Sequence, residues 1–178
     1  MKLLPSPRRP FLKWAGGKRW LADRHPNLFD VSYKRFVEPF LGSGAIFFHL
    51  SPRISLLSDS NTALIGTYVA VRDNWKNVVR CLKRHHGRHS PSYYYQVRSS
   101  NPKSSASQAA RIIYLNRTCW NGLFRVNKNG MFNVPVGTKT NVILDTDDFE
   151  TVSALLSRAV IRACDFETTL SECGMGDL

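Results

Sequence analysis

The stretch RFVEPFLGSGAIFFHL, residues 35–50, decides the fold of this 178-residue chain. Its first five residues have the apolar character of a short buried strand, and residues 42–44 place a glycine on either side of a serine. The apolar run 45–50 then opens a helix. Glycines between a strand and a helix let the backbone turn tightly and approach a ligand, and the helix N-terminus offers unpaired N–H groups to an anionic group. The stretch therefore predicts a ligand site.

A second strand follows at residues 53–59 and ends in Asp59. Together with the preceding segments it completes a β-α-β unit of the nucleotide-binding kind. An acid at this point accepts hydrogen bonds from ribose hydroxyls in such folds; the alternative is that Asp59 caps the helix that starts near Asn61. The chain lacks the spacing G-x-G-x-x-G, and residues 16–18 do not form a Walker loop, which argues against a plain NAD or ATP site.

A group of helices is predicted between the second strand and the third. From Asn61 onward the apolar residues follow helical spacing, with Asn61 and Asp73 as candidate N-caps. Ser90, followed by a proline, starts another short helix, and residues 109–115 resume an apolar helix after a polar loop. Strand composition returns only at residues 159–165, so the helices form an insertion in the β-α-β pattern.

Two local signals lie between these helices and the third strand. An Asn-Gly pair at 129–130 separates residues 125–128 from residues 131–134, and this pairing suits a type I′ turn with positive φ at both central positions. It predicts a β-hairpin. The spacing D-x-x-E at 147–150 resembles a capping box in front of another helix.

Charge is distributed unevenly along the chain, whose formal net charge is +12. Residues 1–36 carry nine Lys or Arg against two Asp or Glu, and residues 72–128 carry twelve against Asp73 alone. Residues 141–178 are acidic, with two bases against eight acids. A uniformly solvated basic surface is the bland explanation, but so long a stretch with one acid favours contact with the phosphates of a nucleic acid.

Composition excludes several classes of protein. With 43% hydrophobic residues, the chain can bury the core of one domain. Its apolar runs fall far short of the ~20 residues that span a bilayer, and its start is too short and proline-broken for a secretory signal, so we expect a cytoplasmic protein with no membrane partner. The four cysteines form no C-x-x-C pair and have no histidine at ligand spacing, so no metal site is expected.

Six blocks of the sequence resemble, in order and spacing, those of the Dam-like DNA adenine-N6 methyltransferases (class D12, alpha group). The blocks are residues 11–18, 37–45, 58–61, 114–116, 121–127 and 130–137. The resemblance implies an α/β, Rossmann-like fold that binds S-adenosylmethionine, with an inserted helical and β-hairpin subdomain for DNA recognition. It divides the chain into residues 1–61 and 141–178, which belong to the cofactor-binding domain, and residues 62–140, which form the insertion.

The cofactor implied by the resemblance is S-adenosyl-L-methionine. Trp14 and Lys18 are implied to line its pocket, with Lys18 near the carboxylate, and Asp59 is implied to take the ribose. A block at the third strand is implied to hold the adenine ring, the acid to its amino group and the aromatic ring against its face. The implied cofactor-binding residues are Trp14, Lys18, Phe40, Gly42, Gly44, Asp59, Asp165 and Phe166.

The partner implied by the resemblance is double-stranded DNA, from which the target adenine is swung out of the stack. Arg125 presents the two-donor fork that matches guanine O6 and N7, and Asn121 could pair with a base edge. Trp120 is flat enough to fill the gap left by a flipped nucleotide, and Lys13 is a candidate for base or phosphate contact. The alternatives are that Trp120 belongs to the core and that Arg125 contacts only phosphate.

In the same family an Asp-Pro-Pro-Tyr tetrapeptide activates the adenine amine, and the 178 residues contain no Pro-Pro pair. We therefore expect an adenine methyltransferase cut short before that motif and inactive alone, and we assign no catalytic residue. A missing fourth strand would leave residues 35–39 at an exposed sheet edge that favours self-association. The alternatives are a catalytically silent module that binds S-adenosylmethionine, DNA or both, and a generic basic Rossmann-like binder of nucleic acid.

Overall fold

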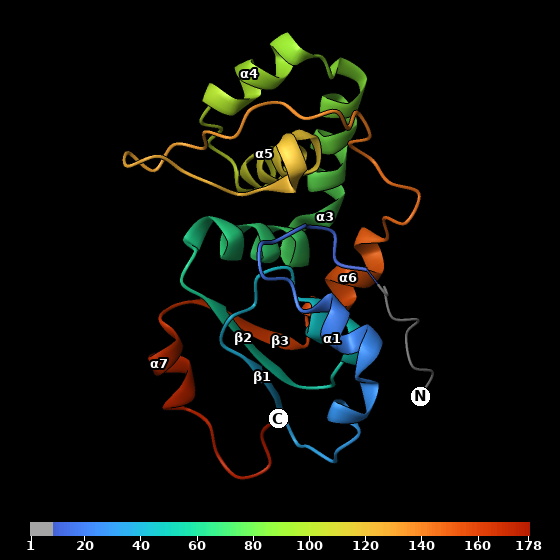
Figure 1. The fold of residues 1–178 in the computed structure, drawn as a ribbon, viewed down its shortest axis with the longest axis vertical. Coiled ribbons are helices and arrows are strands. Elements are labelled where there is room, and N and C mark those ends of the chain that lie inside the picture. Colours follow the sequence, from blue (N-terminus) through green and yellow to red (C-terminus); the bar gives the residue numbers. More distant parts are fainter. Residues whose placement is uncertain (1–8) are drawn as a thin grey trace.

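Three parallel strands form the sheet at the centre of the lower half of the molecule (Figure 1). The computed structural model describes residues 9–178; the first eight residues, on which the expectation about a secretory signal rests, lie outside this part. The strands are β1 (Phe36–Glu38), β2 (Ser55–Asp59) and β3 (Ala159–Ala163), in the order β1-β2-β3. The predicted α/β class is confirmed, and β2 occupies the middle because both of its neighbours pair with it in parallel.

The strands agree with the predicted positions to within two residues at each end. The register pairs Val37 with Leu56 and Leu56 with Val160, so the carboxyl ends of β1 and β2 lie at the same edge of the sheet. The other edge of β1 contacts the last two residues described. Val37 N–H donates to the carbonyl of Leu178 (2.8 Å), and Leu178 N–H donates to the carbonyl of Arg35 (3.0 Å). This is the side of β1 on which the sequence analysis placed a fourth strand.

Short helices flank the sheet. The helices α1 (Arg19–Arg24) and α2 (Ala45–Leu50) contact each other, and a 3-10 turn (Pro26–Phe29) follows α1. The helix α6 (Phe149–Leu156) packs against α3, which also contacts β2 and β3, while α7 (Phe166–Leu170) contacts β2. Helix α2 buries four of its six residues, which accounts for its almost entirely apolar sequence.

The long helix α3 (Thr62–Arg88) joins the sheet to an upper layer of helices (Figure 1). Asn61 caps its start by accepting a hydrogen bond from Leu64 N–H, as predicted. Asp73 is not a cap: the break falls at Asn74, whose backbone leaves helical geometry, and Asp73 instead pairs with Arg72. The kink turns the second half of α3 away from the sheet (Figure 1).

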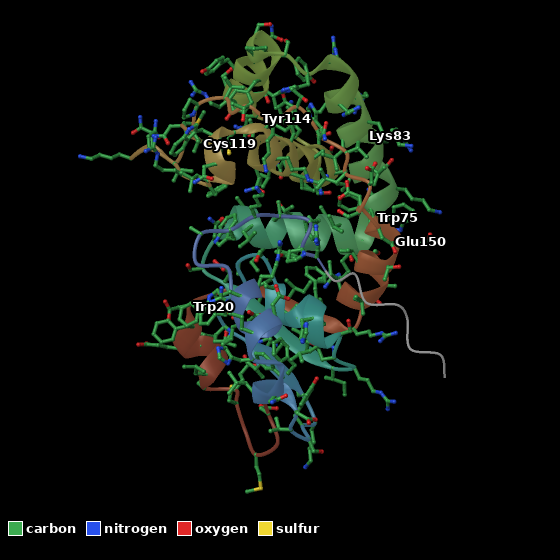
Figure 2. All side chains as sticks on the ribbon, turned by 45° about the vertical axis from the view of Figure 1, so that its right-hand side comes forward. Trp20, Trp75, Lys83, Tyr114, Cys119 and Glu150 are labelled. Atoms are coloured by element: carbon green, nitrogen blue, oxygen red, sulfur yellow. The ribbon has the colours of Figure 1, made fainter. Side chains whose placement is uncertain are left out.

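The upper layer consists of the second half of α3, α4 (Pro91–Ser99) and α5 (Ser105–Thr118), with a 3-10 turn at Trp120–Gly122. Ser90 caps α4 by accepting from Tyr93 N–H, as predicted, whereas α5 starts four residues before the predicted helix. Tyr114 and Cys119 lie in this layer, and Trp75 and Glu150 lie on the side where α3 meets α6 (Figure 2). The described residues include no helix long and apolar enough to cross a bilayer.

The predicted hairpin forms, but its turn is not type I′. Val126 and Phe132 form an antiparallel bridge, and Gly130 N–H donates to the carbonyl of Asn127 (2.9 Å). Only Gly130 has positive φ within this turn, so the loop is a tight turn followed by a left-handed glycine. The Asn127 side chain decides this by accepting from the N–H groups of Asn129 and Met131, both at 3.0 Å.

The predicted capping box at 147–150 is wrong by one residue. Asp148 is the N-cap of α6 and accepts from Thr151 N–H. Asp147 instead forms a two-pronged ion pair with Arg117, with both N···O distances at 2.6 Å. Arg117 is buried, and a buried guanidinium needs a counterion, so Asp147 is used for a tertiary contact that local sequence does not reveal.

Candidate functional site

The glycine turn between β1 and α2 shapes a pocket at the carboxyl edge of the sheet. Gly42 and Gly44 both have positive φ, and Gly44 is the left-handed N-cap of α2. A Cβ on Gly42 would approach a ring carbon of Trp14 to 3.0 Å, and one on Gly44 would meet Phe48 at 3.1 Å. Backbone conformation and space therefore both require glycine at these two positions.

The pocket encloses about 350 Å³. It is built by the segment before α1, the end of β1 with the glycine turn, and the end of β2. The residues that line it are Trp14, Ala15, Gly16, Gly17, Lys18, Glu38, Phe40, Leu41, Gly42, Ser43, Ala45 and Asp59. The fold thus brings together five of the eight implied cofactor residues, which are Trp14, Lys18, Phe40, Gly42 and Asp59.

Asp59 joins the glycine turn to the start of α3. One carboxylate oxygen accepts from Gly42 N–H and the other accepts from Asn61 N–H, both at 3.0 Å. Asp59 is not the cap of α3, because Asn61 performs that role. Each oxygen of a carboxylate can accept more than one hydrogen bond, so Asp59 keeps acceptor capacity toward the pocket that it lines.

Glu38 is a charged residue of the pocket lining for which the sequence indicated no role. Its carboxylate is buried, and Oε2 has no hydrogen-bond partner among the described residues. Lys18 Nζ lies 3.3 Å from Oε1 and also donates to the carbonyl of Phe40 (2.9 Å). Burial raises the pKa of Glu38 to about 7, against the lowering effect of the Lys18 ammonium. A buried carboxylate in the pocket lining, with the Lys18 ammonium as its ion-pair partner, suits a cationic ligand group.

The implied adenine-binding residues lie at the rim of this pocket and do not line it. Phe166 stacks on Phe40, with ring centroids 5.2 Å apart and planes 28° apart, and both rings are exposed. Asp165 caps α7 by accepting from Glu167 N–H (2.9 Å). Exposed apolar rings at a pocket rim provide flat surfaces for a ring-shaped ligand.

Trp14 connects the pocket to the segment that is implied to read DNA. Its indole stacks on Phe124, with centroids 4.9 Å apart and planes 26° apart. The neighbouring Lys13 is held by Asn116, which accepts from Lys13 N–H (2.9 Å) and donates to its carbonyl (2.8 Å). The same amide donates to the carbonyl of Gly122 (3.1 Å), so the N-terminal segment, α5 and the turn after α5 are fixed together.

Three of the four implied DNA-contacting residues lie around this turn and are exposed. Trp120 is 57% exposed, so it is not part of the core. Asn121 has positive φ (56°), so its backbone departs from regular helix geometry, as a short polar residue can. Arg125 donates through Nε to the side chain of Asn133 (2.9 Å), which leaves the terminal nitrogens of the guanidinium fork for other acceptors.

These features define an α/β protein with a nucleotide-type pocket at the carboxyl ends of parallel strands and, beside it, an exposed turn that is followed by Arg125. The family model described as D12 class N6 adenine-specific DNA methyltransferase matches residues 14–176. The chain therefore belongs to the D12 class of N6 adenine-specific DNA methyltransferases, which confirms the resemblance recognised in the sequence.

Curated relatives come from bacteria, archaea and viruses. The chain is 39% identical to the Type II methyltransferase M1.LlaDCHI of Lactococcus lactis subsp. cremoris. The alignment covers 95% of this chain and 63% of the relative. It is 34% identical to the Type II methyltransferase M.MjaIII of Methanocaldococcus jannaschii, with 89% of this chain and 63% of the relative covered. It is 34% identical to a DNA adenine methylase of Haemophilus influenzae, with 90% and 58% covered. The chain thus spans about three fifths of these relatives.

Proposed function

We propose that this chain supplies the cofactor-binding and DNA-reading parts of a DNA adenine-N6 methyltransferase that uses S-adenosyl-L-methionine. The observation that carries the proposal is the stack of Trp14 on Phe124, because it joins a nucleotide-type pocket directly to the segment after α5 that carries the exposed Arg125. A protein of this kind works where the DNA is, which agrees with the expected cytoplasmic location.

The residues of the pocket fit the chemical groups of S-adenosylmethionine. The Glu38 carboxylate suits the α-ammonium of the methionine part, and Lys18 suits its carboxylate. Asp59 suits the ribose hydroxyls, while Phe40 and Phe166 provide faces for the adenine ring. When bound, the cofactor supplies a methyl group from its sulfonium.

Asp165 and Gly44 complete the proposed cofactor set. The Asp165 carboxylate uses one oxygen for its capping bond and keeps the other for an amino donor such as that of adenine. Gly44 places the N-terminus of α2 behind the pocket. We assign no catalytic residue, since the tetrapeptide that performs that role by resemblance does not occur in the 178 residues.

On the DNA side, the exposed turn carries the proposed readers. Trp120 fills the gap left by a flipped adenine, Asn121 and Arg125 contact base edges, and Lys13 approaches from the N-terminal segment. The bond from Arg125 to Asn133 fixes the direction of the guanidinium before DNA arrives. A preset direction lowers the entropic cost of binding.

Cofactor binding is tested by comparing Asp59→Ala with Asp145→Ala, which removes an exposed acid far from the pocket lining. Calorimetric titration with S-adenosylmethionine should show a loss of roughly tenfold or more in affinity for Asp59→Ala, because hydrogen bonds to a charged group contribute roughly 1.5–3 kcal/mol. Asp145→Ala should bind normally. Unchanged affinity in a folded Asp59→Ala protein would favour the generic nucleic-acid binder.

The second half of the proposal is tested with unmethylated duplex DNA and S-adenosylmethionine. Duplex binding by gel shift, with N6-methyladenine measured by mass spectrometry after digestion, separates the two functional candidates. Binding of both ligands without product supports the cofactor and recognition role for this chain. Binding of neither ligand would refute it.

A further inference from the structure

A basic cavity lies apart from the lining of the cofactor-type pocket. It encloses about 520 Å³ and lies where the N-terminal segment, α1, the end of α5 and the loop after the hairpin meet. Its lining residues are Arg9, Pro10, Phe11, Leu12, Lys13, Arg19, Asn116, Arg117, Thr138, Lys139, Thr140, Asn141, Leu144 and Thr146. Five of these residues are cations, and three of them, Arg9, Arg19 and Lys139, take no part in the sites described so far.

The cavity lining contains cations and neutral polar groups but no Asp or Glu from residues 9–178. Arg117 is already neutralised, because it pairs with Asp147 and donates to the carbonyls of Phe11 and Val142. For the other four cations no ion pair with a described residue is found, and they are Arg9, Lys13, Arg19 and Lys139. The hydroxyls of Thr138 and Thr140 and the amide of Asn141 add neutral hydrogen-bond donors.

Two of these cations line the same cavity as neighbours. Lys139 lowers the pKa of Lys13, and partial burial and the charge of Arg19 act in the same direction. Like charges this close repel, so the arrangement costs free energy while the cavity is empty of anions. An anion placed between the two ammonium groups would convert the repulsion into attraction to both.

The backbone holds both lysines in place. Lys13 is fixed by its two hydrogen bonds to Asn116. Lys139 follows Gly137, which is pressed against the end of α5: Gly137 N–H donates to the carbonyl of Thr118 (2.8 Å), and a Cβ there would lie 2.5 Å from the carbonyl oxygen of Cys119. The backbone of Lys13 and the start of the loop that carries Lys139 are therefore held at the cavity wall.

The cavity adjoins the turn that is proposed to read bases. The Lys13 side chain lies across Gly122, where an added Cβ would come within 2.7 Å of its Cδ. Gly122 belongs to the turn that also contains Trp120 and Asn121. A chain of anions bound at this turn would therefore pass the mouth of the cavity at short range.

We propose that this cavity is a phosphate clamp, in which Lys13, Arg19 and Lys139 bind one backbone phosphodiester of the DNA duplex next to the bases contacted by the turn. The proposal rests on the proposed function, in that it takes duplex DNA as the partner. A phosphodiester carries a single negative charge on two exposed oxygens, which matches donors that converge from three segments. The clamp sets the register of the duplex on the turn and carries no base preference of its own.

The decisive experiment measures duplex binding as a function of salt for Lys139→Gln, with Arg53→Gln as the matched control. Lys139 and Arg53 are both exposed, so neither substitution disturbs the core, and Arg53 lies two residues before β2 and outside the cavity lining. The slope of log K against log salt should fall by about 1 for Lys139→Gln on every duplex sequence, because one phosphate contact is lost. Arg53→Gln should keep the slope of the unaltered protein, and Lys139→Arg should restore it.

An unchanged slope for Lys139→Gln in a protein that binds duplex would overturn the clamp and leave the proposed function intact. Failure of the unaltered protein to bind any duplex would instead overturn the proposed function. The two failures are therefore distinguishable from the same titrations.

A second measurement does not depend on the salt dependence of DNA binding. Acylation of lysines at limiting reagent, read by peptide mass spectrometry, should label Lys13 faster than an ordinary exposed lysine, because its lowered pKa gives more free amine at pH 8. Lys139→Gln should slow this labelling. A short duplex should protect Lys13 and Lys139 at concentrations where inorganic phosphate does not. Equal protection by inorganic phosphate would overturn the DNA assignment in favour of a free-anion site, and no protection by either would overturn the clamp.

Discussion

Glu38 shows at the scale of one residue how burial changes the acidity of a side chain. An exposed glutamate has a pKa near 4.5, whereas burial raises the pKa of Glu38 to about 7. The single salt bridge to Lys18 does not fully compensate for the loss of water. An acid left in this condition favours a bound cation, and the α-ammonium of S-adenosylmethionine would provide one.

The pKa of Glu38 leads to a prediction about stability and pH. Because the folded-state pKa lies above the unfolded value, the folded protein holds more protons between about pH 4.5 and pH 7, and this carboxyl costs stability as pH rises through that window. At about 1.4 kcal/mol per pKa unit, the effect reaches up to about 3 kcal/mol. Urea unfolding at pH 5 and pH 7.5 should therefore show that Glu38→Gln gains stability relative to the unaltered protein as pH rises.

Glu150→Gln provides the control for this measurement. Glu150 is exposed in the first turn of α6, so its substitution should shift stability by a similar amount at both pH values. If the difference between Glu38→Gln and the unaltered protein is the same at pH 5 and pH 7.5, the raised pKa of Glu38 is wrong.

At the scale of elements, close backbone contact positions the segment that follows the hairpin, in addition to the packing of Val134 and Val136 against the core. Cys119 and Val136 form an antiparallel bridge, and Trp120 N–H donates to the carbonyl of Pro135 (2.9 Å). Gly137 comes next and lies directly on the backbone of Cys119. The contact sets the path of the loop toward Lys139. The turn at Trp120–Gly122 and the cavity lined by Lys139 are therefore held by the same backbone contact.

Gly137→Ala is therefore expected to destabilise the protein. The added methyl would lie 2.5 Å from the Cys119 carbonyl oxygen and 3.0 Å from Trp120 N, and a rigid backbone cannot move aside as a side chain can. The expected loss is about 1–3 kcal/mol in the free energy of unfolding, measured with urea. Gly66→Ala is the control, because nothing lies within 4 Å of a Cβ there and alanine in a helix should add about 0.5–1 kcal/mol. Equal stability of the two variants would show that the loop moves freely.

At the scale of the whole molecule, two sites built from different layers share one aromatic contact. Trp14 belongs to the cofactor-type pocket, and Phe124 belongs to the segment after α5 that also packs on Phe132 of the hairpin. A ligand that fixes Trp14 also fixes Phe124, and the coupling free energy between two such sites is reciprocal. Cofactor and DNA are thus expected to strengthen each other's binding.

Phe124→Ala tests this coupling from the DNA side. A stacked aromatic pair contributes about 0.5–1.5 kcal/mol, so S-adenosylmethionine affinity should fall by about 2–12-fold although Phe124 does not line the pocket. Lys128→Ala, at the hairpin tip, should leave cofactor affinity unchanged. Calorimetry gives both values, and circular dichroism checks that the variants are folded. Normal cofactor affinity in folded Phe124→Ala would mean that the two sites act independently.

Much of this architecture can be predicted from sequence because it depends on local chemistry. The glycines of the first turn, the acid that ends β2, the caps Asn61 and Ser90 and the hairpin each follow from residue type and spacing, since backbone conformation and strand alternation are decided within a few residues. The six blocks likewise identify the family, which the comparison confirms over residues 14–176.

What local sequence misses involves competition between near and distant partners. Asp147 has the spacing of a cap but pairs with Arg117, thirty residues away, because a buried guanidinium gains more from it than an exposed helix end does. The turn at 127–130 departs from type I′ because the Asn127 side chain provides two hydrogen bonds to the loop. Both outcomes depend on free-energy differences between alternatives that the sequence permits equally.

The sequence by itself determined the fold class, the family and the order of the elements, because these follow from patterns that short segments carry alone. Only the tertiary structure decided which side chains meet. Burial of Glu38 beside Lys18, the stack of Trp14 on Phe124 and the meeting of Lys13 with Lys139 join residues 20 to 126 positions apart. The physical reason is that desolvation, ring stacking and charge repulsion act across space, and chain separation places no limit on them once the core has formed.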